Sequence, residues 1–182
     1  YMHVIDHGRK YIEKNYERPF FDKFLRNFLS KVLPNTNYFK LTSYLVKFGK
    51  MFQFIFPKKI QNMMELMPTS FPEKTLKVKE KYPAKGKKIA RVALLTGCVQ
   101  KELSPQINES TIRLLNRHGV EVVVPKKIRC CGSLNHHLGK ETDANSDFVN
   151  NIETWYEEHK KGNLDAILSN TSGCGTTLKD YG

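Results

Sequence analysis

Short apolar segments in the second half of the chain are each followed within a few residues by cysteine. Their length and their content of Val, Ile and Leu predict β-strands, the first of them buried. These segments are 89–95, 120–124 and 165–169. Amphipathic segments between them, 105–118 and 141–160, predict helices. Strands that alternate with helices indicate an α/β fold with an open, mostly parallel sheet and crossover helices.

The cysteines stand at corresponding places along this pattern. Cys98 follows the first predicted strand, Cys130 and Cys131 follow the second, and Cys174 follows the third. Parallel strands end at a common edge of the sheet, and open α/β sheets bind their ligands at that edge. We therefore expect the thiols to converge although they are far apart in sequence. Thiolates bind soft metals, so the pattern indicates an iron–sulfur cluster or zinc.

Glycines stand beside these cysteines, at Gly97, Gly132 and Gly173. Glycine lets the backbone approach a bound group closely, so that N–H groups can bond to sulfur and offset the charge of a thiolate-bound cluster. We expect these glycines to shape the loops around the bound group.

Other interpretations of the cysteines explain the pattern less well. Single intracellular cysteines are usually buried and inert, but that account does not explain cysteines at every strand end. A disulfide framework requires a secretory context, and no signal peptide is visible. Structural zinc sites usually contain paired Cys-x-x-Cys motifs, which this sequence lacks. A catalytic cysteine with His136 or His137 as its base would leave the remaining cysteines unexplained.

The first half of the chain has a different composition. Residues 1–88 contain 19 Lys and Arg against 7 Asp and Glu, whereas residues 89–182 contain 11 of each. Apolar residues at helical spacing predict a helical connector over 1–66. Its expected helices are 4–12, 21–32, 37–56 with Asn37 as the cap, and 58–66. The segment 67–88 is rich in proline and lysine, which predicts a linker.

The basic and aromatic first half also suggests two binding functions. Nucleic-acid binding is disfavoured, because the aromatic residues keep the spacing of a core face and no binding motif is present. The helix 37–56 has a broad apolar face with lysines elsewhere, a pattern that can lie on an anionic membrane. Packing of this face on neighbouring helices or on a partner subunit is the favoured alternative. We expect a cytoplasmic protein, with peripheral association at the inner face of the cell membrane as an added role.

Blocks of the second half together resemble the cysteine-rich CCG domain family. They are Leu95-Thr-Gly-Cys-Val-Gln100, the segment 112–125, Cys130-Cys-Gly-Ser-Leu-Asn-His-His-Leu-Gly139, and Asn170-Thr-Ser-Gly-Cys-Gly-Thr-Thr-Leu-Lys-Asp-Tyr-Gly182. This family includes subunits of heterodisulfide reductase, anaerobic glycerol-3-phosphate dehydrogenase and glycolate oxidase, and lactate-utilisation proteins. The blocks are most similar to the glycolate oxidase iron–sulfur subunits. The resemblance implies that 89–182 is the first of two CCG repeats, truncated at its end, and that the chain is a fragment.

The resemblance further implies an electron-transfer subunit of a flavin-dependent enzyme that oxidises glycolate to glyoxylate. Four ligands would hold a [4Fe–4S] cluster, namely Cys98, Cys130, Cys131 and Cys174. FAD and the catalytic site would belong to flavoprotein subunits of the same complex. The wider family ends its motif with Cys-x-x-Cys, and here Thr171 occupies the first of those positions. The alternatives are a subunit of a related lactate, glycerol-3-phosphate or heterodisulfide oxidoreductase, and a docking domain without a cluster.

Overall fold

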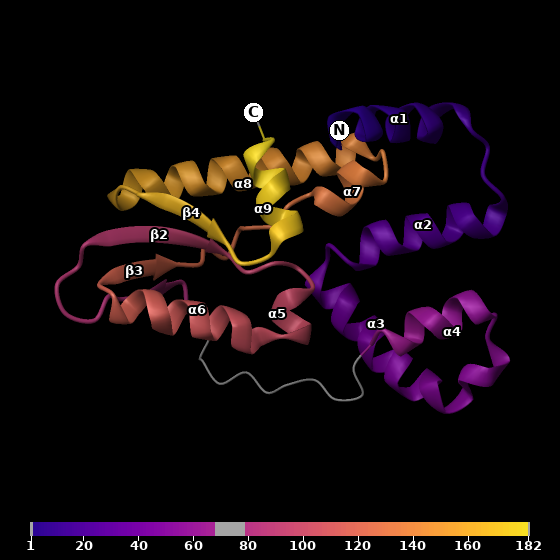
Figure 1. The fold of residues 1–182 in the computed structure, drawn as a ribbon, viewed down its shortest axis with the longest axis horizontal. Helices are drawn as coiled ribbons and strands as arrows, with labels where there is room; N and C mark the ends of the chain where they lie inside the picture. The colour runs from indigo at the N-terminus through magenta and orange to yellow at the C-terminus, as the bar shows by residue number, and fades with distance from the viewer. Residues whose placement is uncertain (1, 68–78, 182) are drawn as a thin grey trace.

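The computed structural model describes residues 2–67 and 79–181, which form a helical N-terminal part and an α/β C-terminal part. The two parts lie end to end along the longest axis of the molecule (Figure 1). The N-terminal part contains helices α1 (Met2–Asn15), α2 (Phe20–Val32), α3 (Thr36–Gly49) and α4 (Lys58–Glu65), with the 3₁₀ helix η1 (Lys50–Ile55) before the last. The C-terminal part contains strands β1 (Lys81–Tyr82), β2 (Ala90–Leu95), β3 (Val120–Val123) and β4 (Ala166–Ser169), and helices α5 (Gln100–Leu103), α6 (Pro105–Arg117), α7 (Ser133–His137), α8 (Glu141–Gly162) and α9 (Ser172–Lys179).

The strands form one sheet in the order β1-β3-β2-β4. The central strand β2 pairs in parallel with both β3 and β4, so that Val92 lies opposite Val122 on one side and Ala166 on the other. β1 adds a short antiparallel edge beside β3. The predicted open, mostly parallel sheet with crossover helices is therefore confirmed.

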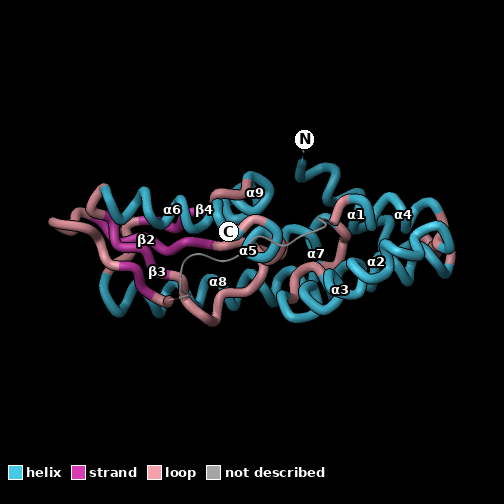
Figure 2. The backbone as a smooth tube through the Cα atoms, turned by 90° about the horizontal axis from the view of Figure 1, so that it is seen from below, coloured by secondary structure: helices cyan, strands magenta, loops and turns pink. Residues whose placement is uncertain are grey.

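Helices cover both faces of the sheet, with α6 on one side and α8 on the other (Figure 2). Side chains along β2 alternate between these faces. Leu94 packs with Ile112 of α6, whereas Ala93 and Leu95 pack with Trp155 of α8. Because both faces are covered, the strand is buried along most of its length, which explains its nearly continuous apolar sequence.

Arg91 is the charged exception within this apolar strand. Its side chain is only 7% exposed, and its guanidinium donates to Glu121 of β3 at 3.0 Å. The guanidinium also donates to the carbonyl of Gly162 at 2.7 Å and pairs with Glu158, both on α8. Arg91 thus joins two strands to the end of the longest helix.

The N-terminal helices follow the expected order but differ in two details. α3 is capped by Asn35 rather than by Asn37, because Asn35 has the extended backbone of a cap and its side chain accepts from the N–H of Asn37 at 3.0 Å. The helix expected over 37–56 is divided into α3 and η1. The backbone leaves the helical conformation at Phe52, where φ is −118° and ψ is 22°. At Gly49, the last residue of α3, a Cβ atom would lie 3.2 Å from Cε of Met64 in α4. The absence of a side chain at this position thus allows α4 to pack closely.

The apolar face expected to form a core along 37–56 is exposed. Leu45 and Phe48 are exposed, whereas Phe39 and Ser43 of the same helix are buried. The spacing therefore predicts α3 correctly, but this face does not pack on neighbouring helices. Packing of the face on a partner subunit stays a prediction. Within the described ranges, no helix is both long and apolar enough to cross a bilayer.

Only part of the expected linker 67–88 can be compared with the structure, because 68–78 lie outside the described residues. The end of the segment belongs to the α/β part. Lys81 and Tyr82 form the edge strand, and the backbone N–H of Lys85 donates to the carbonyl of Asn116 at 2.8 Å.

Candidate metal centre

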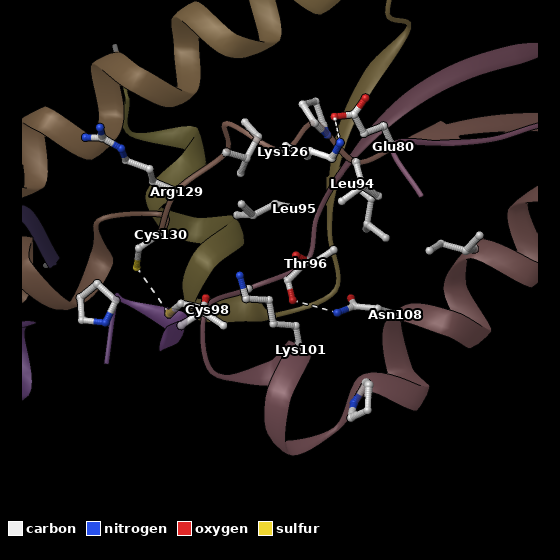
Figure 3. A pocket seen from close by; sticks show the side chains of 18 of the residues that line it. Glu80, Leu94, Leu95, Thr96, Cys98, Lys101, Asn108, Lys126, Arg129 and Cys130 are labelled. Atoms are coloured by element: carbon white, nitrogen blue, oxygen red, sulfur yellow. Dashed lines mark hydrogen bonds and ion pairs between the residues drawn. The ribbon is translucent and has the colours of Figure 1, made fainter. Parts of the chain in front are cut away.

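The cysteines meet at the carboxyl edge of the sheet, as the strand order predicts. Cys98 lies in the turn after β2, Cys130 and Cys131 lie in the loop after β3, and Cys174 lies in the first turn of α9, after β4. The Sγ atoms of Cys98 and Cys130 are 3.5 Å apart, and those of Cys131 and Cys174 are 3.2 Å apart. Figure 3 shows the first pair with the two sulfurs directed toward each other.

All of these cysteines are free thiols within one apolar cluster. Hydrogen bonding to Cys130 and burial raise the pKa of Cys98 well above its usual range. Hydrogen bonding to Cys131 and burial raise the pKa of Cys130 to about 12. Cys130 lowers the pKa of Cys131, but hydrogen bonding to Cys174 and burial outweigh this and raise it to about 12. Hydrogen bonding from Cys131 lowers the pKa of Cys174. The metal-free site therefore contains one sulfur that ionises more readily than the others.

We expect alkylation by iodoacetamide to distinguish these sulfurs in the metal-free chain. The thiolate is the reactive form, and a thiol with a pKa of about 12 has roughly a thousandfold less thiolate at pH 8 than an ordinary cysteine. Cys174 should react first, whereas Cys130 and Cys131 should gain about tenfold in rate per unit of pH. Mass spectrometry of the digested chain measures each rate. Equal rates at every cysteine of the folded chain would contradict this prediction.

The donor set and the spacing of the sulfurs favour an iron–sulfur cluster over a single zinc ion. Thiolates around one tetrahedral zinc ion lie about 3.8 Å from one another, because each Zn–S bond is about 2.3 Å long. Among the described residues, no three cysteine sulfurs lie within 4.8 Å of one another. Two close pairs of soft donors from different loops instead fit a group that contains more than one metal ion, such as an iron–sulfur cluster.

Two of the expected glycines have a backbone conformation that favours glycine. Gly97 and Gly132 have φ angles of +71° and +74°, in the left-handed region. A Cβ atom at Gly132 would also lie 2.4 Å from Cε1 of Phe148. Gly173 instead lies in the first turn of α9, with open space where a Cβ atom would be. Contact of these glycines with a bound group stays a prediction.

Two side chains that the sequence pattern does not identify hold the adjacent cysteines in place. Asn151 of α8 is 0% exposed, donates to the carbonyl of Cys130 at 2.8 Å and accepts from the N–H of Arg129 at 2.8 Å. The hydroxyl of Tyr181 donates to the carbonyl of Cys131 at 2.9 Å. In the sequence, Asn151 could have been identified by its place on the core-facing side of a predicted helix. A side-chain amide buried there needs hydrogen-bond partners.

Replacing Asn151 with leucine should lower the free energy of unfolding by about 2–4 kcal/mol, because two buried backbone groups of the cysteine loop would lose their partners. Urea unfolding followed by circular dichroism measures the change. Asn145→Leu, at an exposed position of the same helix, is the matched control and should change stability by less than about 0.5 kcal/mol. Equal effects of the two substitutions would contradict the role given to Asn151.

A cavity of about 900 Å³ opens beside the pair formed by Cys98 and Cys130. Lys101, Lys126 and Arg129 contribute to its walls, and Figure 3 shows them around the cavity with the sulfurs at one end. The sulfur pair therefore has a polar cavity on one side and the apolar cluster on the other. A group held there would be shielded from water on one side only, and solvent exposure is one determinant of cluster potential.

Thr171, at the position where the resemblance implies a cysteine, is directed toward the loop of Cys98. Its hydroxyl donates to the side-chain carbonyl of Gln100, whose amide donates to Asn170 at 2.6 Å. The hydroxyl also lies 3.7 Å from the place where a Cβ atom of Gly97 would be. Thr171 thus supports the loop through hydrogen bonds to its neighbours.

The histidines considered as catalytic bases lie in a different environment. His137 Nδ1 is 2.9 Å from Asp6 Oδ1, and His136 Nε2 is 3.5 Å from Asp6 Oδ2. In the part of the chain that the structure describes, neither imidazole hydrogen-bonds to a cysteine. The geometry therefore gives no support to a cysteine nucleophile activated by either histidine.

Comparison with known proteins gives matches across the chain. Residues 92–179 match the family model of the cysteine-rich domain, CCG. The chain is 32% identical, over its full length and 42% of the relative, to the glycolate oxidase iron–sulfur subunit of Escherichia coli K12. It is 39% identical, over 62% of its length and 22% of the relative, to an uncharacterized iron–sulfur protein of Methanococcus maripaludis. It is 27% identical, over 70% of its length and 28% of the relative, to a probable glycolate oxidase iron–sulfur subunit of Bacillus subtilis. The chain thus spans less than half the length of these relatives. No solved structure matches it.

Proposed function

We propose that this chain, in which residues 92–179 belong to the cysteine-rich CCG domain family, is the cluster-binding part of an iron–sulfur electron-transfer subunit of an oxidoreductase. The observation that carries the proposal is the convergence of the cysteines from three strand ends into two close sulfur pairs. Free thiols in an apolar cluster, with glycine-bearing turns beside them, support the same conclusion.

The proposed ligands are Cys98, Cys130, Cys131 and Cys174, and the proposed group is a [4Fe–4S] cluster. When bound, such a cluster supplies one-electron transfer. The chain's own residues hold the sulfurs, keep water from the side covered by α8, and fix the loop that carries the adjacent cysteines. Gly97, Gly132 and Gly173 are proposed to let the backbone come close to the cluster.

Anaerobic reconstitution with ferrous iron and sulfide tests this proposal. The wild-type chain should take up about four irons and give an EPR signal on reduction, and Cys130→Ser should lose most of both. Thr176→Val is the matched control, because Thr176 is exposed on α9 and its hydroxyl donates to the carbonyl of Ser172 in the same helix, and it should retain the iron. Unchanged iron content and EPR signals in Cys130→Ser would remove Cys130 from the ligand set, and the same result for each of the four cysteines would reject the proposal.

The proposed reaction of the complete complex is the oxidation of glycolate to glyoxylate, with FAD on partner flavoprotein subunits. The support is the similarity to the two relatives named as glycolate oxidase subunits. In this arrangement the cysteine site receives electrons from the flavin subunit and passes them onward. Reduction of the cluster by glycolate, followed by EPR in the assembled complex, tests the assignment. Reduction by lactate or glycerol 3-phosphate but not by glycolate would identify a related oxidoreductase instead.

The exposed apolar face of α3 and η1 is the surface we assign to the flavoprotein partner. Leu45, Phe48 and Phe54 are exposed there, and lysines lie near them in sequence. A protein partner is favoured because subunit interfaces bury aromatic side chains. Flotation of the assembled complex with anionic liposomes would support peripheral membrane binding instead.

A further inference from the structure

A second group of metal-binding side chains lies away from the cysteine sulfurs, where α1 meets α7. Figure 1 shows the two helices side by side. Asp6 of α1 faces both His136 and His137 of α7. One potential ligand atom from each of these residues lies within 4.8 Å of the other two. Among the described residues, this group alone brings three or more potential metal ligands so close together.

The spacing of these atoms fits one metal ion. Ligand atoms about 2.1 Å from a tetrahedral zinc ion lie about 3.4 Å apart, and Asp6 Oδ2 is 3.5 Å from His136 Nε2. His137 Nδ1 is 2.9 Å from Asp6 Oδ1, so a small rotation of the carboxylate would place an ion between them. Two imidazole nitrogens and a carboxylate form a donor set for divalent transition metals, whereas calcium and magnesium prefer oxygen ligands.

The surroundings of His136 provide an independent indication. Its Nδ1 atom is buried without a hydrogen-bond partner, as is Oε1 of Glu141, and these two atoms face each other at 3.5 Å. A metal at Nε2 leaves the ring proton on Nδ1, where it points toward the Glu141 carboxylate. A carboxylate behind a ligating histidine orients the ring and raises the basicity of the ligand. Lys10 holds the other oxygen of Glu141 at 2.7 Å.

One cation already contacts the group. Arg9 donates to Asp6 Oδ1 at 3.0 Å, and the Arg9 side chain is 46% exposed whereas that of Asp6 is 10% exposed. The arginine can therefore move outward or keep a single hydrogen bond to the carboxylate, while Asp6 stays in place. Hydrogen-bonded support of this kind is usual around ligating carboxylates.

We propose that Asp6, His136 and His137 form a second metal site, for a divalent transition-metal ion such as Zn²⁺. The site would join the first helix of the chain to the short helix that directly follows the adjacent cysteines. The backbone in this region is already packed closely, since a Cβ atom at Gly139 would lie 3.0 Å from the carbonyl of Arg9. The proposal does not depend on what the cysteines bind.

Calorimetric titration with Zn²⁺ tests the site in a full-length variant with every cysteine replaced by serine. One ion per chain should bind, and Asp6→Ala or His136→Ala should weaken binding by at least about a hundredfold. His7→Ala is the matched control, because His7 is exposed on the same helix, and it should leave the affinity unchanged. Absence of Zn²⁺ binding by the folded variant, or binding that survives Asp6→Ala, would overturn the proposal.

Cobalt spectroscopy keeps the test decisive if the serine variant does not fold. The wild-type chain with its cysteine site reconstituted is titrated with Co²⁺. We expect the weak visible bands of nitrogen and oxygen ligation, which His137→Ala should abolish. Intense thiolate charge-transfer bands, or a spectrum that His137→Ala leaves unchanged, would assign the cobalt to other residues and reject the site.

Discussion

Gly132→Ala is expected to destabilise the chain by about 2–5 kcal/mol and to prevent iron uptake. The left-handed conformation at this position, with φ of +74°, costs a non-glycine residue about 1–2 kcal/mol. The added Cβ atom would lie 2.4 Å from Cε1 of Phe148 and 3.1 Å from the carbonyl of Ala144, and overpacking of this kind costs a further 1–3 kcal/mol or so. Urea unfolding and iron analysis after reconstitution measure the two effects.

Gly86→Ala separates the two contributions. Gly86 has the same φ of +74°, but no atom lies within 4 Å of the place where its Cβ would be. It should therefore cost only about 1–2 kcal/mol and leave iron uptake intact. Adding Phe148→Leu to Gly132→Ala should restore part of the lost stability by relieving the clash. If Gly132→Ala and Gly86→Ala had equal effects, close packing of Phe148 on the cysteine loop would have no energetic role.

Strand order and the position of the cysteines could be predicted because they follow from local patterns. The parallel strands are short apolar runs, although only β2 and β3 are buried along most of their length. The crossover helices require these strands to end at one edge. The residues after each strand therefore had to meet, and the sulfur pairs are found there. β1 could not be predicted in this way, because Lys81 and Tyr82 form a two-residue edge strand within a lysine-rich segment.

The residues that support the site could not be predicted, because their partners are distant in sequence. Asn151 lies 21 residues from the cysteine whose carbonyl it binds, and a polar residue in a helix pattern is usually solvated. His136 and His137 follow the cysteine motif closely, but their contacts are with Asp6, 131 residues away from His137. The side of α3 that faces the core could not be predicted either, because the aromatic residues that remain exposed also have helical spacing.

Arg91→Met is expected to lower the free energy of unfolding by about 3–5 kcal/mol at neutral pH, since removing one partner of a buried ion pair leaves the other partner uncompensated. Glu121 keeps Lys81 and Lys88, at 3.0 and 3.1 Å. Glu158 is left with the exposed Lys161, and the carbonyl of Gly162 loses its donor. The loss should therefore come mainly from the end of α8.

The loss of unfolding free energy caused by Arg91→Met should also depend on pH. The direction of this dependence follows from the pKa of Glu158. Burial raises the pKa of Glu158, but hydrogen bonds from Lys161 and Arg91 outweigh it and hold the pKa below its ordinary value of 4.5. A carboxyl group whose pKa is lowered on folding stabilises the chain above the unfolded pKa and loses that contribution as pH falls through the folded pKa. The difference between wild type and Arg91→Met should therefore be largest near neutral pH and shrink below pH 4.5.

Urea unfolding from pH 3 to pH 8 or so measures this dependence, with Lys126→Met as the control. Lys126 and its partner Glu80 are 82% and 55% exposed and lie 3.2 Å apart, so the replacement should cost less than about 1 kcal/mol at any pH. Arg91→Lys should lie between the two, because an ammonium cannot reproduce the planar set of donors that reaches β3 and α8 together. A small, pH-independent effect of Arg91→Met would mean that the sheet and α8 are held together by apolar packing alone, with the buried charges nearly neutral in their effect on stability.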